Sequence, residues 1–145
     1  MAKKKGQRDG FSLIELMVVI IILGLLAALV MPNVLGKGEQ AKQRLTCVQM
    51  KSIAQSLEMY KQDNGEYPTT EQGLQALVAN PDPERFTGYL PGGYVSGKNV
   101  PKDPWNRAYI YLQEASGFEL ISLGGDGKEG GSDENRDLRL SECER

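Results

Sequence analysis

The sequence predicts an α+β fold in which one long N-terminal helix packs on a small antiparallel β-sheet head. Three observations support this prediction. Residues 11–31 are almost entirely apolar, residues 32–63 repeat apolar side chains at helical spacing, and residues 64–145 combine short β-rich segments with frequent Gly and Pro. At 145 residues the chain is about one domain long, which is enough to bury a sizeable core.

Composition and charge exclude several classes of function. The chain has no histidine, so it lacks the commonest general base and the commonest transition-metal ligand. No nucleophile–base pair is visible either, and we expect no enzymatic activity. The net charge of −2 is not typical of a nucleic-acid-binding protein, and we expect no nucleic-acid partner. The charge is divided unevenly, because residues 1–10 carry +3 and residues 11–145 carry −5.

The apolar segment 11–31 predicts a membrane-spanning helix. Its twenty-one residues contain one charged side chain, Glu15, and one other polar side chain, Ser12. A helix of this length, at about 1.5 Å per residue, covers the roughly 30 Å hydrocarbon core of a bilayer. A buried core helix is a poor alternative because no other region could surround it, and no small-x-small cleavage site follows it as in a secretory signal. The basic residues in 1–10 predict a cytoplasmic N-terminus and a translocated head.

Glu15 is the one carboxylate within the apolar segment. A charge at the centre of a membrane helix costs about 2.5–3.5 kcal/mol and therefore usually has a partner. One interpretation is that Glu15 lies at the membrane interface with its charge solvated. The other starts from Gly10-Phe11, which reads as a peptidase site. Cleavage there would leave a cationic amine on Phe11, and this amine can pair with Glu15 of a neighbouring copy.

Residues 32–63 predict the amphipathic half of the same helix. Pro32 removes one helical hydrogen bond, and we expect a kink or a local break near residues 28–36. Farther along, apolar residues recur at helical spacing and predict one face that packs on the head. That face consists of Met50, Ile53, Leu57 and Tyr60, and we expect Ala41, Leu45 and Val48 to extend it.

The head, residues 64–145, begins with a turn and a short helix. Asp63-Asn64-Gly65 has the chemistry of a turn and ends the long helix. Thr69 and Gln72 form a capping box, in which each side chain can bond the backbone of the other, and this predicts a short helix after them.

Two β-rich segments, 109–112 and 118–123, predict a hairpin with its turn at 114–117. Trp105 stands just before this hairpin, after a Pro- and Gly-rich loop. Together with the tyrosines it could form a ligand platform, but packing of the sheet against the helix is the favoured interpretation.

The N-terminal segment resembles the leader and first helix of type IV pilins and type II secretion pseudopilins. The resemblance rests on a basic leader followed by Gly10, Phe11, a small residue, two aliphatic residues and Glu15, all ahead of an apolar tract. It implies that a prepilin peptidase cuts between Gly10 and Phe11 and N-methylates Phe11. It also implies that Glu15 sets the register between subunits during assembly.

Three head segments narrow the resemblance to the major, G-type pseudopilins of type II secretion systems: NGEYPTTEQGLQALV, VPKDPWNRAYIY and LISLGGDGKEGG. The resemblance implies a type IV pilin-like subunit, anchored once in the inner membrane with its head in the periplasm. Its copies would form a helical periplasmic filament that drives export of folded exoproteins across the outer membrane. The implied partners are minor pseudopilins, the prepilin peptidase and an inner-membrane assembly platform. The alternative is a type IV pilin for adhesion, twitching or DNA uptake.

The Gly- and Asp-rich loop 123–137 is a candidate calcium site. Its glycines permit tight turns, and its carboxylates are the hard oxygen ligands that calcium prefers. On composition alone, an exposed acidic loop is the alternative. The resemblance to G-type pseudopilins implies a structural calcium ion. The implied ligands are the carbonyls of Leu123 and Gly131, the side chains of Asp126 and Asp133, and a fifth from Glu134, Asn135 or Asp137.

The two cysteines, Cys47 and Cys143, are far apart in the sequence. An oxidising periplasm would allow them to form a disulfide, whereas their spacing excludes a CxxC zinc or redox site. The sequence does not show whether they approach each other. Neither cysteine belongs to the pattern that we associate with G-type pseudopilins.

Overall fold

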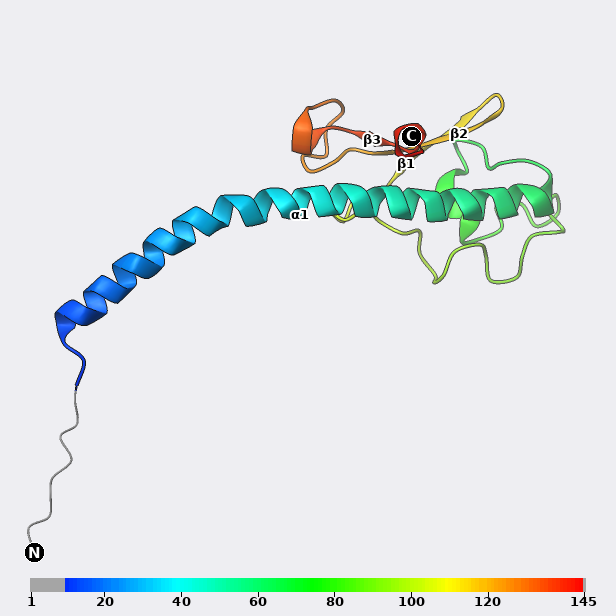
Figure 1. Cartoon of the computed structure of the whole chain (residues 1–145). Helices are drawn as coiled ribbons and strands as arrows, with labels where there is room; N and C mark the ends of the chain where they lie inside the picture. Colours follow the sequence, from blue (N-terminus) through cyan, green and yellow to red (C-terminus); the bar gives the residue numbers. More distant parts are fainter. Residues whose placement is uncertain (1–9, 145) are drawn as a thin grey trace, which may run out of the picture. The chain divides into compact units, whose positions relative to one another are not determined.

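The computed structural model describes residues 10–144, and side chains are described at 10–29 and 37–144 (Figure 1). The predicted leader 1–10 therefore lies outside the described residues, except for Gly10. The chain divides into two compact units, Met1–Gly38 and Glu39–Arg145, and each is described by itself. The elements are α1 (Leu13–Asn64), the 3-10 helix η1 (Gly73–Leu77), β1 (Ile110–Glu114), β2 (Gly117–Ser122), the 3-10 helix η2 (Asp133–Asn135), β3 (Leu138–Arg139) and α2 (Leu140–Cys143).

The described part of the first unit is the beginning of α1. Ser12 caps the helix, because its Oγ accepts a hydrogen bond from the Glu15 backbone N–H at 3.3 Å. Every side chain from Phe11 to Leu29 is exposed. Among residues 10–29 and 37–144, no helical segment combines the length and the apolar character needed to cross a membrane. Val30 and Met31, which end the predicted 11–31 segment, lie outside those residues.

The local break that we expected near residues 28–36 is wrong. The helix assignment of α1 runs without interruption from Leu13 to Asn64, through Pro32. A proline removes only one backbone donor, and the hydrogen bonds of the neighbouring turns are enough to keep the helix. The sequence analysis also allowed a kink near residues 28–36, and this kink stays a prediction.

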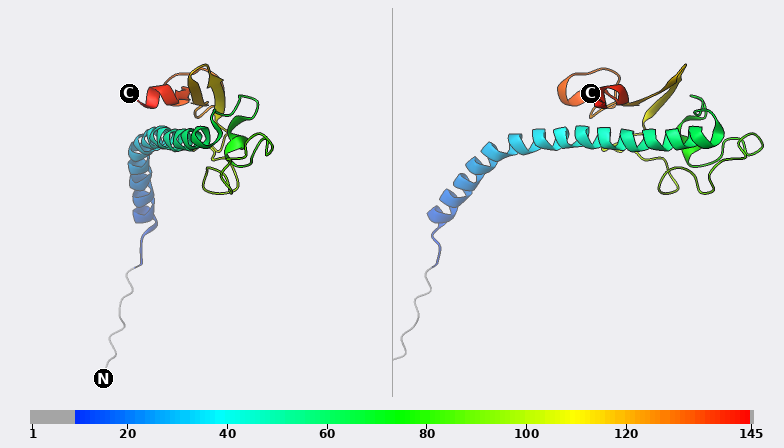
Figure 2. Two further views of the ribbon diagram at one scale, coloured as in Figure 1. Left: turned by 90° about the vertical axis from the view of Figure 1, so that its right-hand side faces the viewer. Right: turned by 45° about the vertical axis from the view of Figure 1, so that its right-hand side comes forward.

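The core of the second unit lies between α1, η1 and the sheet. The buried face of α1 contains Met50, Ile53, Leu57 and Tyr60, as predicted. Figure 2 shows the sheet on one side of this half of α1 and the loop around residues 80–100 on another. The other buried apolar residues of the core cluster are Leu74, Ala76, Leu77, Tyr94, Tyr109, Tyr111, Leu120, Leu138 and Leu140.

The expectation that Ala41, Leu45 and Val48 extend the buried face is wrong. Leu45 is 48% exposed, Val48 is 64% exposed, and Ala41 is exposed as well. At 100° per residue, Val48 lies about 140° around the helix from Ile53, so it cannot share that residue's buried face. The polar residue Thr46, which is fully buried, takes the core position instead and donates its hydroxyl hydrogen bond to the Lys42 carbonyl at 2.8 Å. The exposed side of α1 thus carries a second apolar stripe, which consists of Ala41, Leu45 and Val48.

The predicted capping box and hairpin are both present. The Thr69 backbone N–H donates to Gln72 Oε1 at 2.9 Å, and the Gln72 N–H donates to Thr69 Oγ1 at 3.2 Å. The short helix that follows is the 3-10 helix η1. β1 and β2 pair antiparallel, with Tyr111 opposite Leu120. The sequence did not reveal β3, a two-residue strand that adds to β2 and completes the order β1-β2-β3.

Candidate functional site

The predicted processing site lies just before α1. Gly10 and Phe11 are exposed and precede the first helical residue, so the Gly10–Phe11 bond is not protected by helical hydrogen bonds. Phe11 is 83% exposed. Glu15 lies in the first turn of α1, where a carboxylate interacts favourably with the helix dipole. This placement fits both interpretations of Glu15, the solvated charge and the partner of a neighbouring amine.

The two cysteines are brought together. Cys47 of α1 and Cys143 of α2 form a disulfide, with Cα atoms 5.5 Å apart. The bond joins residues separated by 96 positions and holds the short C-terminal helix against α1. The pairing that the sequence left open is therefore present in the structure.

A buried carboxylate, Asp103, organises the region beside the Gly-rich loop. Asp103 is only 4% exposed. Its Oδ1 accepts hydrogen bonds from the backbone N–H groups of Trp105 (3.1 Å) and Arg107 (2.8 Å), and its Oδ2 accepts one from the Ser122 hydroxyl (2.7 Å). Three donors satisfy a charge that would otherwise be costly to bury. Sequence reasoning missed this residue, although an aspartate flanked by prolines is a turn signal that could have drawn attention to it.

Trp105 connects this region to α1. Its indole Nε1–H donates to Glu39 Oε2 at 2.9 Å, and the ring packs against the edge of the core. This hydrogen bond, followed by the one from Lys42, holds the pKa of Glu39 below its ordinary value. The packing interpretation of Trp105 is confirmed, because its one hydrogen-bonding group is used within the fold.

Arg107 supports the first part of the Gly-rich loop. Its Nη1 donates to the carbonyls of Gly124 (2.7 Å) and Gly125 (3.1 Å). Gly127 has a φ of +69°, and a Cβ there would lie 2.5 Å from Arg107 Nε. Arg107 therefore holds one positive charge against the loop, and the positive φ of Gly127 disfavours any other residue there.

The carboxylates of the loop are spread rather than clustered. Asp126 is exposed and its Oδ1 accepts the Lys128 N–H at 3.0 Å. Asp133, Glu134 and Asn135 form η2 and are exposed; the Asp133 carbonyl accepts a hydrogen bond from Gln43 of α1 at 3.1 Å. Within the described part of the chain, no three acidic or cysteine side chains gather closely enough to hold a metal ion.

Asp137 is the loop carboxylate that best fits a cation. Its Oδ2 accepts the Gly130 N–H at 2.9 Å, whereas its Oδ1 is buried without a hydrogen-bond donor. A buried carboxylate oxygen without a donor is costly unless a cation or water satisfies it. Leu123 and Gly131, whose carbonyls are predicted ligands, belong to the same loop. Asp137 is therefore the loop carboxylate with an oxygen left for a cation, and the calcium ligand set stays a prediction.

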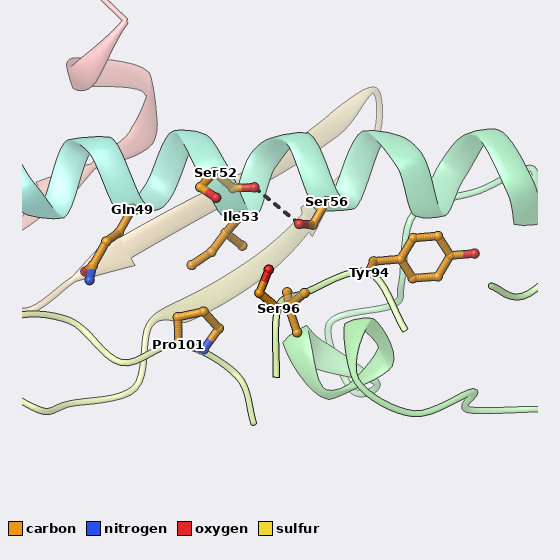
Figure 3. A pocket seen from close by; sticks show the side chains of 8 residues that line it. Gln49, Ser52, Ile53, Ser56, Tyr94, Ser96 and Pro101 are labelled. Carbon is orange, nitrogen blue, oxygen red and sulfur yellow. Dashed lines mark hydrogen bonds between the residues drawn. The ribbon is translucent and has the colours of Figure 1, made fainter. Parts of the chain in front are cut away.

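The small pocket in Figure 3 lies beside α1 and has an uncharged lining. Its volume is about 180 Å³, and none of its eight lining residues is charged. The Ser56 hydroxyl donates to the Ser52 carbonyl at 3.3 Å, and Gln49 Oε1 accepts the Tyr109 hydroxyl at 2.6 Å. Two of the polar groups of the pocket are therefore engaged within the fold.

Comparison with known proteins identifies the class and then the family. A prokaryotic N-terminal methylation motif matches residues 5–31. The structure is similar to the crystal structure of the major pseudopilin from the type 2 secretion system of enterohaemorrhagic Escherichia coli. The TM-score is 0.57 at 33% identity, over 74% of this chain and 93% of that one. A methylation motif, a long N-terminal helix and a small antiparallel sheet together define the pilin-like class, as the sequence predicted.

Within that class, the family profile described as type II secretion system protein G matches residues 33–141. The type II secretion system core protein G of Pseudomonas aeruginosa is 48% identical, over 93% of this chain and 96% of the relative. Its counterpart in Vibrio cholerae is 44% identical, over 94% of this chain and 93% of the relative. The chain belongs to the type II secretion system protein G family, and the alternative of a type IV pilin is not favoured.

Proposed function

We propose that this chain is the major structural subunit of a type II secretion pseudopilus, which assembles helically and drives export of folded exoproteins across the outer membrane. Two comparisons support the proposal: the relatives are core protein G subunits, and the similar crystal structure is a major pseudopilin. The observation that carries it is the exposed apolar surface of α1 from Leu13 to Leu29, in a chain whose second unit buries its own core. An apolar surface of this size requires a partner, either lipid or other copies. The role is structural rather than catalytic.

Maturation would expose the group that pairs with Glu15. A prepilin peptidase would cut the Gly10–Phe11 bond and N-methylate the new terminus, which stays cationic. The amine of one copy and the Glu15 carboxylate of its neighbour would then neutralise each other where neither is well solvated. This pairing would fix the axial register of the subunits.

Before assembly, the helix would hold each copy in the inner membrane. The basic residues 1–10 favour a cytoplasmic N-terminus, so that the head lies in the periplasm. An oxidising periplasm also agrees with the Cys47–Cys143 disulfide. The inner-membrane assembly platform and the minor pseudopilins would then be its partners in filament growth.

A structural calcium ion would complete the Gly-rich loop. Asp137, Asp126 and the carbonyls of Leu123 and Gly131 would hold it, with Asp133, Glu134 and Asn135 as further oxygen donors. The ion would supply positive charge to a loop whose Asp137 Oδ1 has no donor. Arg107 would continue to hold the first turn of the loop through Gly124 and Gly125.

The proposal is tested by expressing the chain with the other components of a type II secretion system, in a host that lacks its own G subunit. We expect filaments that can be sheared from the cells and seen by electron microscopy, together with restored secretion. Mass spectrometry should show a mature chain that begins with methylated Phe11. A mature chain that begins at Met1, or one that has lost residues 11–31, would contradict the proposal.

A further inference from the structure

A basic pocket lies beside α1 in the second unit. Its volume is about 410 Å³, and it is formed by the start of that half of α1 together with the chain just before β3. Two arginines line it, Arg44 and Arg136, and both are exposed. The other lining residues are Gln40, Gln43, Cys47 and Leu138.

The two guanidinium groups have no acidic partner. Among the residues that the structure describes, ion pairs join Lys42 to Glu39 and Arg85 to Glu66, and neither Arg44 nor Arg136 takes part in one. Two like charges that line one pocket repel each other until an anion lies between them. The planar fork of an arginine is suited to a carboxylate, which it can bind through two parallel hydrogen bonds. The pocket therefore favours a carboxylate ligand.

This pocket is an exception on an acidic head. Residues 39–145 contain twelve Lys and Arg against seventeen Asp and Glu. Two such heads would repel each other in most orientations, unless a basic part of one faces an acidic part of the other. Charge complementarity therefore selects a second copy of this same chain as an occupant of the pocket.

The apolar stripe described above approaches the pocket at Val48. Arg44 and Val48 are four residues apart and are neighbours on the surface of α1, and Leu45, three residues from Val48, continues the stripe away from Arg44. Leu45 and Val48 are both largely exposed. A charged pocket beside exposed aliphatic side chains has the composition of a protein contact, in which the apolar part is buried and the arginine fixes the orientation.

We propose that Arg44 and Arg136 bind an acidic side chain of a second copy, with Leu45 and Val48 buried in the same contact. This inference rests on the proposed filament function, and it assigns a contact between heads in addition to the packing of residues 11–31. The pocket and the acid that fills it are different surfaces of the subunit. The contact is therefore heterologous, the kind that continues from copy to copy and produces a filament rather than a closed dimer.

The test compares Arg44→Glu with Lys98→Glu in the full chain, expressed with the secretion components described above. Both substitutions change the charge of an exposed residue by the same amount, but Lys98 does not line the pocket. We expect Arg44→Glu to lower the yield of sheared filaments at least about tenfold, the effect of about 1.4 kcal/mol per contact. Lys98→Glu should stay within about twofold of the unmodified chain. Arg44→Lys keeps the charge but loses the planar fork, so its filament yield should lie between those of Arg44→Glu and the unmodified chain. Thermal unfolding of the purified chains should be equal, because Arg44 is exposed.

A complementary charge reversal on a second copy identifies the acidic residue that binds in the pocket. Arg44→Glu copies co-expressed with copies in which an exposed head glutamate away from the pocket, Glu129 or Glu142, is changed to Lys should recover filaments for at least one of these two partners. Filament yield from Arg44→Glu equal to that from Lys98→Glu would overturn the inference. Normal filaments but lost secretion in Arg44→Glu would also overturn the inference, because the pocket would then bind an acidic exported protein. A failure of the unmodified chain to form filaments would instead contradict the proposed function.

Discussion

The two units of this chain use apolar side chains in opposite ways. In the first unit, every described apolar side chain from Phe11 to Leu29 is exposed. In the second unit, α1, η1 and the three strands enclose a core in which Met50, Leu57 and Tyr60 are fully buried. The first unit therefore depends on lipid or on other copies for its stability, whereas the second depends on its own packing. Substitutions in the two units should accordingly fail in different assays.

Replacement of Glu15 should have the largest effect on assembly. Glu15→Ala removes the carboxylate that is proposed to pair with the Phe11 amine of a neighbour, so filament yield should fall at least about tenfold. Membrane insertion should not change, because the substitution makes the helix more apolar. Electron microscopy of sheared filaments and the membrane-bound fraction of the protein measure the two effects. Glu15→Gln should behave like Glu15→Ala, and normal secretion by either variant would contradict the pairing.

Truncation of a core residue should have the largest effect on the stability of the head. Leu57→Ala leaves a cavity at a fully buried position and should lower the free energy of unfolding by about 2–5 kcal/mol. Met59→Ala, two residues away but about half exposed, should cost less than about 1 kcal/mol. Denaturation of the full chain in detergent, followed by Trp105 fluorescence, measures both.

A matched substitution in the first unit tests whether the two units have separate roles. Ile20→Ala should leave the unfolding of the head unchanged and reduce filament yield, because Ile20 is exposed on the apolar part of α1. If Ile20→Ala destabilised the head as much as Leu57→Ala does, the division of roles between the two units would be wrong.

Removal of the disulfide should destabilise the head by about 2–4 kcal/mol. The bond closes a loop over 96 positions, and its loss increases the conformational entropy of the unfolded chain. Cys47→Ser combined with Cys143→Ser should match the unmodified protein under reducing conditions, measured by urea denaturation. Equal midpoints for the oxidised and reduced unmodified protein would show that the bond adds nothing to stability.

Calcium should raise the melting temperature of the full chain by several degrees, and chelation should reverse the increase. Asp137→Asn should abolish this response, because Asp137 provides the buried oxygen that has no donor. Asp133→Asn should reduce it less, because the Asp133 side chain is exposed. Isothermal titration with calcium provides a second measurement. A response retained in Asp137→Asn would place the ion elsewhere.

Acid should produce the smallest of these effects, through Glu39. The Trp105 hydrogen bond lowers the pKa of Glu39 below 4.5, so the ionised form stabilises the folded state at neutral pH. This contribution is lost as the pH falls below 4.5 and through the lowered pKa of the folded protein. Glu39→Gln should therefore lose less stability than the unmodified chain between pH 6 and pH 3, as followed by Trp105 fluorescence. Identical acid profiles would contradict the assignment.

Local patterns in the sequence predicted much of the fold. The capping box of Thr69 and Gln72, the end of α1 near Asn64 and the hairpin of β1 and β2 each depend on residues close together in the chain. The short strand β3 escaped prediction because two residues carry too little periodicity. Leu45 and Val48 were assigned to the wrong face: at 100° per residue each lies about 140° around the helix from a buried residue five positions later, Met50 and Ile53 respectively.

The sequence by itself determined the processing motif, the apolar segment and the family, because each depends on the order of residues along the chain. Three further features exist only in the folded protein. Folding joins Cys47 to Cys143, satisfies the Asp103 carboxylate with three donors, and brings Arg44 and Arg136 into the lining of one pocket. These groups come from distant parts of the chain. Their contacts exist only because the folded core brings α1, the Gly-rich loop and the C-terminal segment together.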